Sequence, residues 1–160
     1  MTKKLFWDDP YLYECKARIT SIEGNKVKLD QTIFYAFSGG QASDSGTIGE
    51  INVINAIKLG DKENIIDIEY ELEKIPSFNI GDEVDVKIDG QKRSSLMKLH
   101  SAAHIAYYFI TAKLGKLKII GSNITPEKAR IDFEYEGTFI DVLPEIEDKI
   151  NMFLNEDHQI

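Results

Sequence analysis

The chain has 160 residues, 42% of them hydrophobic and 29% charged, which is ordinary for a globular protein with one domain or two small ones. A net charge of −8 argues at first against a nucleic-acid partner. No apolar run approaches the roughly 20 residues of a membrane span, and the N-terminus lacks the apolar core of a signal peptide. We therefore expect no membrane partner and a cytoplasmic location. Because Cys15 is the only cysteine, an internal disulfide and a cysteine-rich zinc site within these residues are excluded.

The first ninety residues read as short strands separated by turns. Alternating or β-branched runs predict strands at 13–22, 26–30, 32–35, 46–57 (one or two strands), 64–72 and 83–89. Gly24 supplies the permissive backbone position of the first hairpin. This spacing predicts a small antiparallel β-barrel or sandwich, and we assign a barrel domain to residues 1–90.

The pattern changes at Asp89, which is a plausible N-cap for a helix that ends at Gly115. Apolar residues at steps of three and four form one stripe along that helix: Leu96, Leu99, Ala103, Ala106, Ile110 and Leu114. Two strands follow at 116–120 and 129–135, around Gly121-Ser122 and a Thr125-Pro126 turn.

A last amphipathic helix is predicted from about residue 139 or 144 to 154. Its inward residues are expected to be Ile146, Ile150, Phe153 and Leu154. Residues 91–160 therefore form a second, α+β domain, and the whole chain is predicted to be α+β.

His100 and His104 stand four residues apart on the long helix, so they share one face. Two imidazoles placed that way can offer nitrogens to one metal ion. No Glu stands beside the first histidine, so the metalloprotease motif is incomplete. A structural pair of helix histidines remains an equal alternative, and His158 is expected to be an exposed terminal histidine.

The charge is unevenly distributed along the chain. Residues 91–130 carry eight Lys or Arg against Glu127 alone, whereas the segments before and after them are acidic. A local basic surface can attract phosphates even on an acidic protein, although a solvated helix face explains the same pattern.

A second constellation lies between residues 29 and 46. Gly39 and Gly40 allow a tight turn or a close backbone approach, and the surrounding polar residues are Thr32, Gln41, Ser43 and Asp44. Taken alone, this composition is explained more simply by a polar hairpin loop. The spacing is not that of a phosphate-binding P-loop, so ATP binding is not expected.

Several short motifs occur in one order: Thr32-Ile-Phe-Tyr, Ser38-Gly-Gly-Gln, Asp44-Ser-Gly, then Arg93, Met97 and His100-Ser-Ala-Ala-His104, and finally Gly121-Ser122 and Lys128-Ala-Arg-Ile-Asp-Phe. Over residues 5–135 this pattern resembles alanyl-tRNA editing proteins of the AlaX type, relatives of the editing domain of alanyl-tRNA synthetase. Ser38 and Ser101 are mild departures, since the family usually has glycine and threonine there.

The resemblance implies a barrel beside an α+β editing domain, and a trans-editing hydrolase that deacylates Ser-tRNA(Ala) or Gly-tRNA(Ala) in a Zn²⁺-dependent site. It implies that His100 and His104 are zinc ligands and that the Thr32 hydroxyl distinguishes serine from alanine. Thr32 and Gln41 are the implied catalytic residues.

The implied substrate-binding set is wider: Thr32, Gly39, Gly40, Gln41, Asp44, Arg93 and Arg130. Its arginines, with Lys98, are expected to meet phosphates of the tRNA acceptor end.

One departure is larger. The family completes its zinc site with a Cys-x-x-x-His motif, and these 160 residues contain none. We therefore expect an editing domain that is incomplete at its C-terminus, with a weak two-ligand zinc site. The alternative is a non-catalytic module that binds the tRNA acceptor end.

Overall fold

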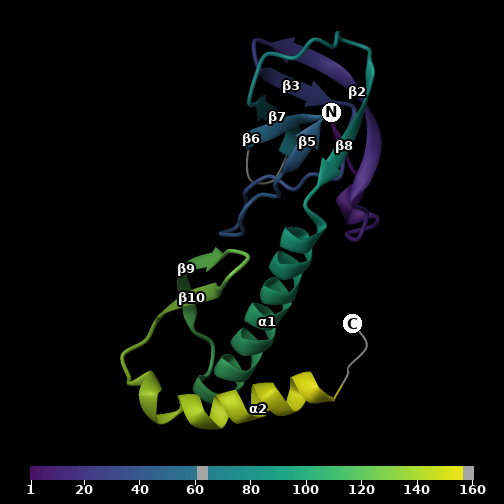
Figure 1. Ribbon diagram of the computed structural model, residues 1–160. Coiled ribbons are helices and arrows are strands. Elements are labelled where there is room, and N and C mark those ends of the chain that lie inside the picture. Colours follow the sequence, from purple (N-terminus) through teal and green to yellow (C-terminus); the bar gives the residue numbers. More distant parts are fainter. Residues whose placement is uncertain (61–64, 157–160) are drawn as a thin grey trace. The chain divides into compact units, whose positions relative to one another are not determined.

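The computed structural model describes residues 1–60 and 65–156, which form strands, two α-helices and two short 3₁₀ turns (Figure 1). The α+β class predicted from the sequence is confirmed. The chain divides into two compact units, with Met1–Ser38 and Ala42–Ser95 in the first, and Gly39–Gln41 with the chain from Leu96 onward in the second. The boundary between the two units lies after Ser95, whereas the sequence predicts a domain boundary after Gly90. The segment Gly39–Gln41, from the N-terminal half of the chain, belongs to the second unit.

Six antiparallel strands of the first unit pair in the order β2-β3-β7-β6-β5-β8 and close a barrel, because β8 also pairs with β2. They are β2 (Glu14–Glu23), β3 (Lys26–Leu29), β5 (Gly46–Ile48), β6 (Ile51–Gly60), β7 (Ile65–Leu72) and β8 (Glu83–Ile88). A separate parallel pair joins β1 (Lys3–Lys4) to β4 (Gln31–Thr32), and a 3₁₀ turn spans Leu5–Trp7.

Alternation along the strands builds the core of this unit. In β8, Val84, Val86 and Ile88 are buried while the residues between them are exposed. Because successive side chains of a strand point to opposite faces, such a sequence places every second residue inside. Tyr70 and Leu72 of β7 are fully buried in the same cluster.

Several strand boundaries differ from the prediction. The segment 32–35 contributes only Thr32 to a strand, and Ile33 and Phe34 are buried outside regular structure. The segment 46–57 forms two strands, separated at Gly49 and Glu50, both with positive φ. The predicted strand 64–72 begins at Ile65 in β7, and Asn64, like His158, lies outside the described residues.

A buried ion pair ties loops of the first unit together. The Asp44 carboxylate accepts hydrogen bonds from the Arg93 guanidinium, with 3.0 Å between Nε and Oδ1, and from the Tyr35 backbone N–H at 2.7 Å. Arg93 also donates to the backbone oxygens of Pro10 (2.9 Å) and Ile33 (2.6 Å). Asp44 and Arg93 are 5% and 3% exposed, so the charges neutralise each other almost without water.

Helix α1 (Gly90–Leu114) begins and ends where the sequence predicts. The Asp89 carboxylate accepts a hydrogen bond from the Lys92 backbone N–H at 3.0 Å, which is the N-cap contact. Gly115 follows the helix with a φ of +81°, a conformation that glycine adopts without strain.

In the second unit, β9 (Lys118–Ile124) and β10 (Ala129–Glu134) form an antiparallel hairpin. The prediction that Gly121-Ser122 lies outside the strands is wrong, since β9 runs through both residues. Both residues pair with β10, Gly121 with Asp132 and Ser122 with Ile131, and the Asp132 carboxylate lies where a Cβ at Gly121 would stand.

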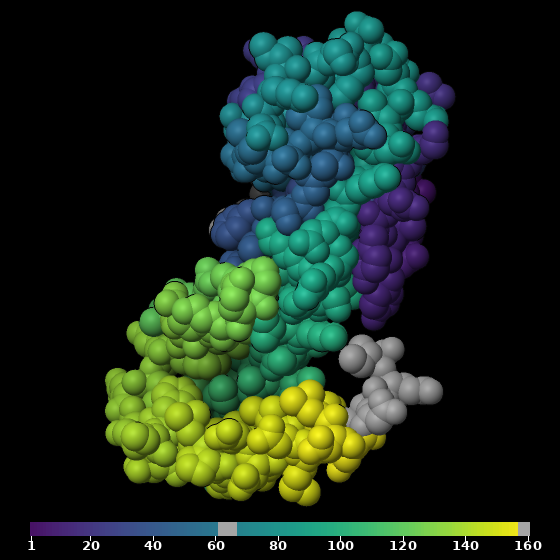
Figure 2. Space-filling model, in the orientation of Figure 1, coloured from purple at the N-terminus to yellow at the C-terminus, as the bar shows by residue number. Residues whose placement is uncertain are grey.

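Helix α2 (Leu143–Asn155) follows a short 3₁₀ turn (Phe139–Asp141) and packs against α1 (Figures 1 and 2). The rings of Phe109 and Phe153 meet edge-on at 5.8 Å. The ammonium groups of Lys113 and Lys149 bond Glu145 and lower the pKa of its carboxyl to about 2. Ile146 is buried as predicted, but Leu154 is 51% exposed, so its predicted inward position is wrong.

Neither of the two helices described combines the length and the apolar character that crossing a membrane requires.

The Arg93–Asp44 pair gives a first prediction. Replacing Arg93 with Met leaves the Asp44 carboxylate buried without its cation, which should lower the free energy of unfolding by about 3–5 kcal/mol. Chemical denaturation monitored by circular dichroism measures the change. In the control, Lys16→Met removes the exposed ion pair with Glu83 (3.2 Å) and should cost at most about 1 kcal/mol. Equal losses in the two variants would contradict the structural role of the buried pair.

Candidate active site around the histidine pair

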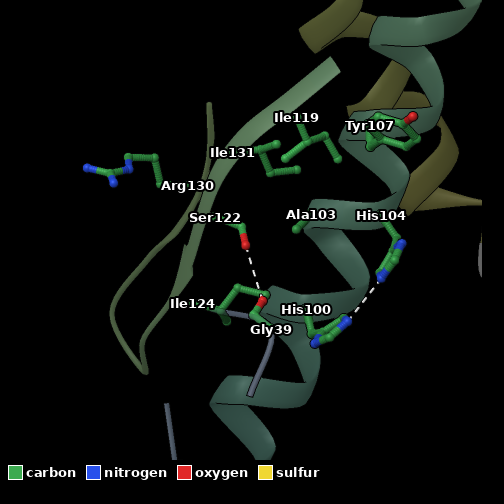
Figure 3. Close-up of a pocket in the computed structure, with 10 residues that line it drawn as sticks. All are labelled: Gly39, His100, Ala103, His104, Tyr107, Ile119, Ser122, Ile124, Arg130 and Ile131. Atoms are coloured by element: carbon green, nitrogen blue, oxygen red, sulfur yellow. Dashed lines mark hydrogen bonds between the residues drawn. The ribbon is translucent and has the colours of Figure 1, made fainter. Parts of the chain in front are cut away.

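The two histidines of α1 lie directly beside each other in the second unit. Their rings stack with centroids 4.9 Å apart and planes 21° apart, and the two Nε2 atoms are separated by 2.9 Å (Figure 3). The i and i+4 spacing thus brings both imidazoles to one spot, as the sequence predicts.

Gln41 fixes which nitrogen of His100 carries the proton. The Gln41 side-chain oxygen lies 2.5 Å from His100 Nδ1, and because an amide oxygen only accepts hydrogen bonds, Nδ1 is the protonated nitrogen. His100 Nε2, the nitrogen left with the lone pair, lies 2.9 Å from His104 Nε2. Burial, and secondarily the neighbouring His104, lowers the pKa of His100, so the neutral ring is favoured at pH 7.

The segment Gly39–Gln41 reaches this position by joining the edge of β9. The Ile124 backbone N–H donates to the Gly40 oxygen at 2.9 Å, Gln41 forms a parallel bridge with Ile124, and the Ser122 hydroxyl donates to the Gly39 oxygen at 3.1 Å. A Cβ at Gly40 would overlap the backbone oxygen of Ser122, so this approach requires glycine. Gln41 itself is buried.

A cavity of about 280 Å³ opens beside the histidine pair. The helix and the hairpin supply its walls, which are Gly39, His100, Ala103, His104, Tyr107, Ile119, Ser122, Ile124, Arg130 and Ile131. Figure 3 shows Ile119 and Ile131 directed from the hairpin towards the helix, whereas the Arg130 side chain extends away from the cavity. The Arg130 guanidinium bonds the Asp132 carboxylate at 3.2 Å.

Three of the predicted site residues belong to the first unit. Thr32 is fully buried there, and its hydroxyl oxygen accepts hydrogen bonds from the Phe34 N–H at 3.0 Å and the Tyr70 hydroxyl at 2.8 Å. Burial raises the pKa of Tyr70, so this phenol stays protonated and keeps donating. Asp44 and Arg93 bond each other in the buried pair described above. In this geometry Asp44 and Arg93 have a structural role. Their roles in substrate binding, and that of Thr32, stay predictions.

The family resemblance placed Gly39, Gly40 and Gln41 among the substrate-binding residues and the two histidines at a metal, and the second unit contains all five. It missed Tyr107, Ile119, Ile124 and Ile131, which form the apolar walls. Tyr107 follows His104 by three residues on the same helix face, a spacing that marks it as a neighbour of the site. The three isoleucines carry no such signal, because an apolar residue in a strand looks the same whether it faces a core or a cavity.

The two imidazoles fit one half of a zinc coordination sphere. Tetrahedral zinc with Zn–N bonds of about 2.0–2.1 Å separates two ligand nitrogens by about 3.3 Å, and the two Nε2 atoms lie 2.9 Å apart. The hydrogen bond from His100 Nδ1 to Gln41 is the outer contact typical of a metal-binding histidine. Among residues 1–60 and 65–156, no group of three or more His, Cys, Asp or Glu could hold a metal. Zinc binding stays a prediction in which these residues supply two of the ligands.

Comparison with known proteins first defines the class. The family described as tRNA synthetases class II (A) matches residues 10–92. The alanine–tRNA ligase of Sulfurisphaera tokodaii is 34% identical over 158 residues, which are 97% of this chain and 17% of the ligase. The chain is thus related to a short part of a much longer synthetase.

The comparison with freestanding proteins is more specific. The alanyl-tRNA editing protein AlaX-M of Pyrococcus horikoshii is 35% identical over 162 residues, covering all of this chain and 73% of that protein. AlaX-M of Saccharolobus solfataricus is 34% identical over 164 residues, again covering the whole chain and 67% of the relative. The chain belongs to the family of alanyl-tRNA editing proteins.

The close approach of Gly40 to the Ser122 backbone gives a second prediction. Gly40→Ala combines a φ of +82° with overlap against a backbone atom that cannot move alone, so it should destabilise the second unit by more than about 3 kcal/mol. Gly39→Ala is the matched control, because its φ is +60° but nothing lies within 4 Å, and it should cost only about 1–2 kcal/mol. Thermal unfolding together with amide NMR signals of β9 measures both effects. If the two alanine variants behave alike, the close approach does not hold the segment.

Proposed function

We propose that this chain is a trans-editing hydrolase that cleaves the ester of tRNA(Ala) wrongly charged with serine or glycine. The observation that carries the proposal is the His100–His104 pair, with its tautomer fixed by Gln41 and a cavity beside it, in a member of the alanyl-tRNA editing family. The relatives at 35% and 34% identity are named alanyl-tRNA editing proteins. We place the reaction in the cytoplasm, with aminoacyl-tRNA as the partner.

The proposed roles follow from the contacts in each unit. His100 and His104 would hold a Zn²⁺ ion through Nε2, and the Gln41 contact at Nδ1 leaves the lone pair of His100 on its Nε2. When bound, such an ion polarises an ester carbonyl or lowers the pKa of a coordinated water to about 7.

Discrimination between amino acids is assigned to Thr32. A pocket hydroxyl can hydrogen-bond the serine side chain, but it has no partner when alanine is bound. Sites built in this way reject a substrate that lacks the hydroxyl far better than apolar pockets reject an added group. The Phe34 N–H and the Tyr70 hydroxyl already occupy the acceptor positions of Thr32. Its single proton is therefore the group that remains to donate to the seryl oxygen.

Attraction of the tRNA rests on the exposed basic residues of the segment 91–130. Lys98 is exposed, and Arg130 has a side chain 64% exposed, so both can meet phosphates. Arg93 is only 3% exposed, and we leave it out of the proposed phosphate contacts.

A second candidate function is a non-catalytic module that binds the acceptor end of tRNA(Ala). The observation favouring it is that the described part of the chain provides two imidazole ligands, whereas catalytic zinc sites normally have three protein ligands. The two functions differ in whether the ester is cleaved.

Deacylation assays test the main proposal. The chain with added zinc should hydrolyse Ser-tRNA(Ala) faster than Ala-tRNA(Ala), and the double substitution His100→Ala with His104→Ala should abolish both zinc retention and hydrolysis. Elemental analysis and release of radiolabelled serine are the two measurements. Binding of tRNA without any release of serine would support the non-catalytic module, and an unchanged zinc content in the double variant would refute the ligand assignment.

The role of Thr32 has its own test. Thr32→Val should reduce the preference for seryl over alanyl esters by at least about tenfold, because the hydroxyl is lost while the shape is kept. Thr32→Ser retains the hydroxyl and should preserve the preference. The ratio of the two kcat/KM values separates this effect from the general loss of stability expected when Tyr70 loses its acceptor. If Val and Ser variants discriminate equally, Thr32 is not the discriminating group.

A further inference from the structure

Tyr70 of β7 is the barrel residue whose side chain bonds the proposed discriminating group. Its hydroxyl donates to the Thr32 hydroxyl oxygen, with 2.8 Å between the two atoms. The Phe34 backbone oxygen lies farther from the same phenol, at 3.4 Å, so the bond to Thr32 is the shorter of the two. A phenol has a single proton, and this contact uses it. Any influence of Tyr70 on substrate choice is therefore expected to act through Thr32.

Packing in the barrel core holds the Tyr70 hydroxyl in one place. The Tyr70 ring is fully buried and meets the Phe34 ring edge-on, with centroids 5.4 Å apart and planes 68° apart. Ile68 and Leu72, which flank it on the same face of β7, are fully buried too. β7 is hydrogen-bonded to β3 on one side and to β6 on the other. The proton that Thr32 accepts thus comes from a donor of fixed position.

A count of hydrogen-bonding groups shows what Tyr70 adds at Thr32. A threonine hydroxyl has one proton and two acceptor lone pairs, and it rotates to suit its neighbours. The Phe34 N–H, at 3.0 Å, satisfies only one of the lone pairs. With that contact alone, the hydroxyl could turn either its proton or its second lone pair towards a substrate. Tyr70 occupies the second lone pair, so the proton is the group that remains to be offered.

We propose that Tyr70 is a positioning residue for amino-acid specificity, which fixes the Thr32 hydroxyl as a hydrogen-bond donor to the seryl oxygen. The inference rests on the proposed function, because it takes Thr32 to be the group that meets the serine side chain. It extends the discriminating unit to two side chains, from β4 and β7, that are 38 positions apart in the sequence. A seryl oxygen accepts from the fixed donor, whereas an alanyl methyl group leaves that donor without a partner.

Tyr70→Phe tests the proposal, because it removes the phenol oxygen and keeps the ring. The quantity measured is the ratio of kcat/KM for Ser-tRNA(Ala) to kcat/KM for Ala-tRNA(Ala). Tyr70→Phe should lower this ratio about three- to tenfold, through the seryl substrate alone, because the Thr32 hydroxyl is then free to rotate. Tyr35→Phe is the matched control. The Tyr35 hydroxyl lies 3.5 Å from the Ser38 backbone oxygen, and its loss should change the ratio by no more than about twofold.

A double-mutant cycle separates positioning from a purely structural role. In a chain that carries Thr32→Val, adding Tyr70→Phe should leave the ratio unchanged, because the hydroxyl that Tyr70 orients is already absent. The midpoint of thermal unfolding should instead rise on that addition, since a buried phenol without its acceptor is removed. Equal losses of seryl and alanyl hydrolysis in the single Tyr70→Phe variant, or a further fall of the ratio in the double variant, would each overturn the inference.

Binding of stable analogues distinguishes this inference from the proposed function. Seryl and alanyl groups joined to adenosine by an amide in place of the ester are titrated into the chain and measured by calorimetry. A preference for the seryl amide that Tyr70→Phe reduces, in a chain that never releases serine, would refute the hydrolase and support the positioning role. Hydrolysis with a preference that Tyr70→Phe leaves intact would support the hydrolase and overturn the positioning role. Equal binding of both amides without hydrolysis would overturn both.

Discussion

The site depends on one close backbone approach, that of Gly40 to Ser122. A side chain at Gly40 would overlap the backbone of β9, so only glycine lets the segment Gly39–Gln41 hydrogen-bond along that strand. The approach places the Gln41 amide oxygen against His100 Nδ1. That contact decides the tautomer and leaves the lone pair of His100 on its Nε2. The steric requirement for glycine at position 40 therefore decides which nitrogen of His100 carries the proton.

The second unit contains both histidines, Gln41 and the residues that line the cavity. Helix α1 contributes the imidazoles and Tyr107, and the β9–β10 hairpin contributes the isoleucines opposite them. In the first unit, Asp44 and Arg93 neutralise each other, and the Thr32 hydroxyl oxygen accepts a hydrogen bond from Tyr70.

Sequence signals that act within a few residues were reliable. Asp89 caps α1, Gly115 ends it, and the spacing of His100 and His104 brings them together, because caps, backbone conformation and helical period are local properties. The errors occur where packing overrides composition. β9 continues through Gly121-Ser122 because β10 pairs with it, and Leu154 at the end of α2 is exposed although its spacing on the helix predicts an inward position.

By itself the sequence determined the α+β class, the helix with its histidine pair and the family to which the chain belongs. Only the tertiary structure decided that Gln41 orients His100, that Arg93 and Asp44 are buried together, and that a hairpin builds apolar walls beside the histidines. Gln41 and His100 are 59 positions apart, and Asp44 and Arg93 are 49 apart. Contacts at such separations depend on how distant elements pack, and the same residues read locally are equally compatible with a polar loop and a solvated helix face.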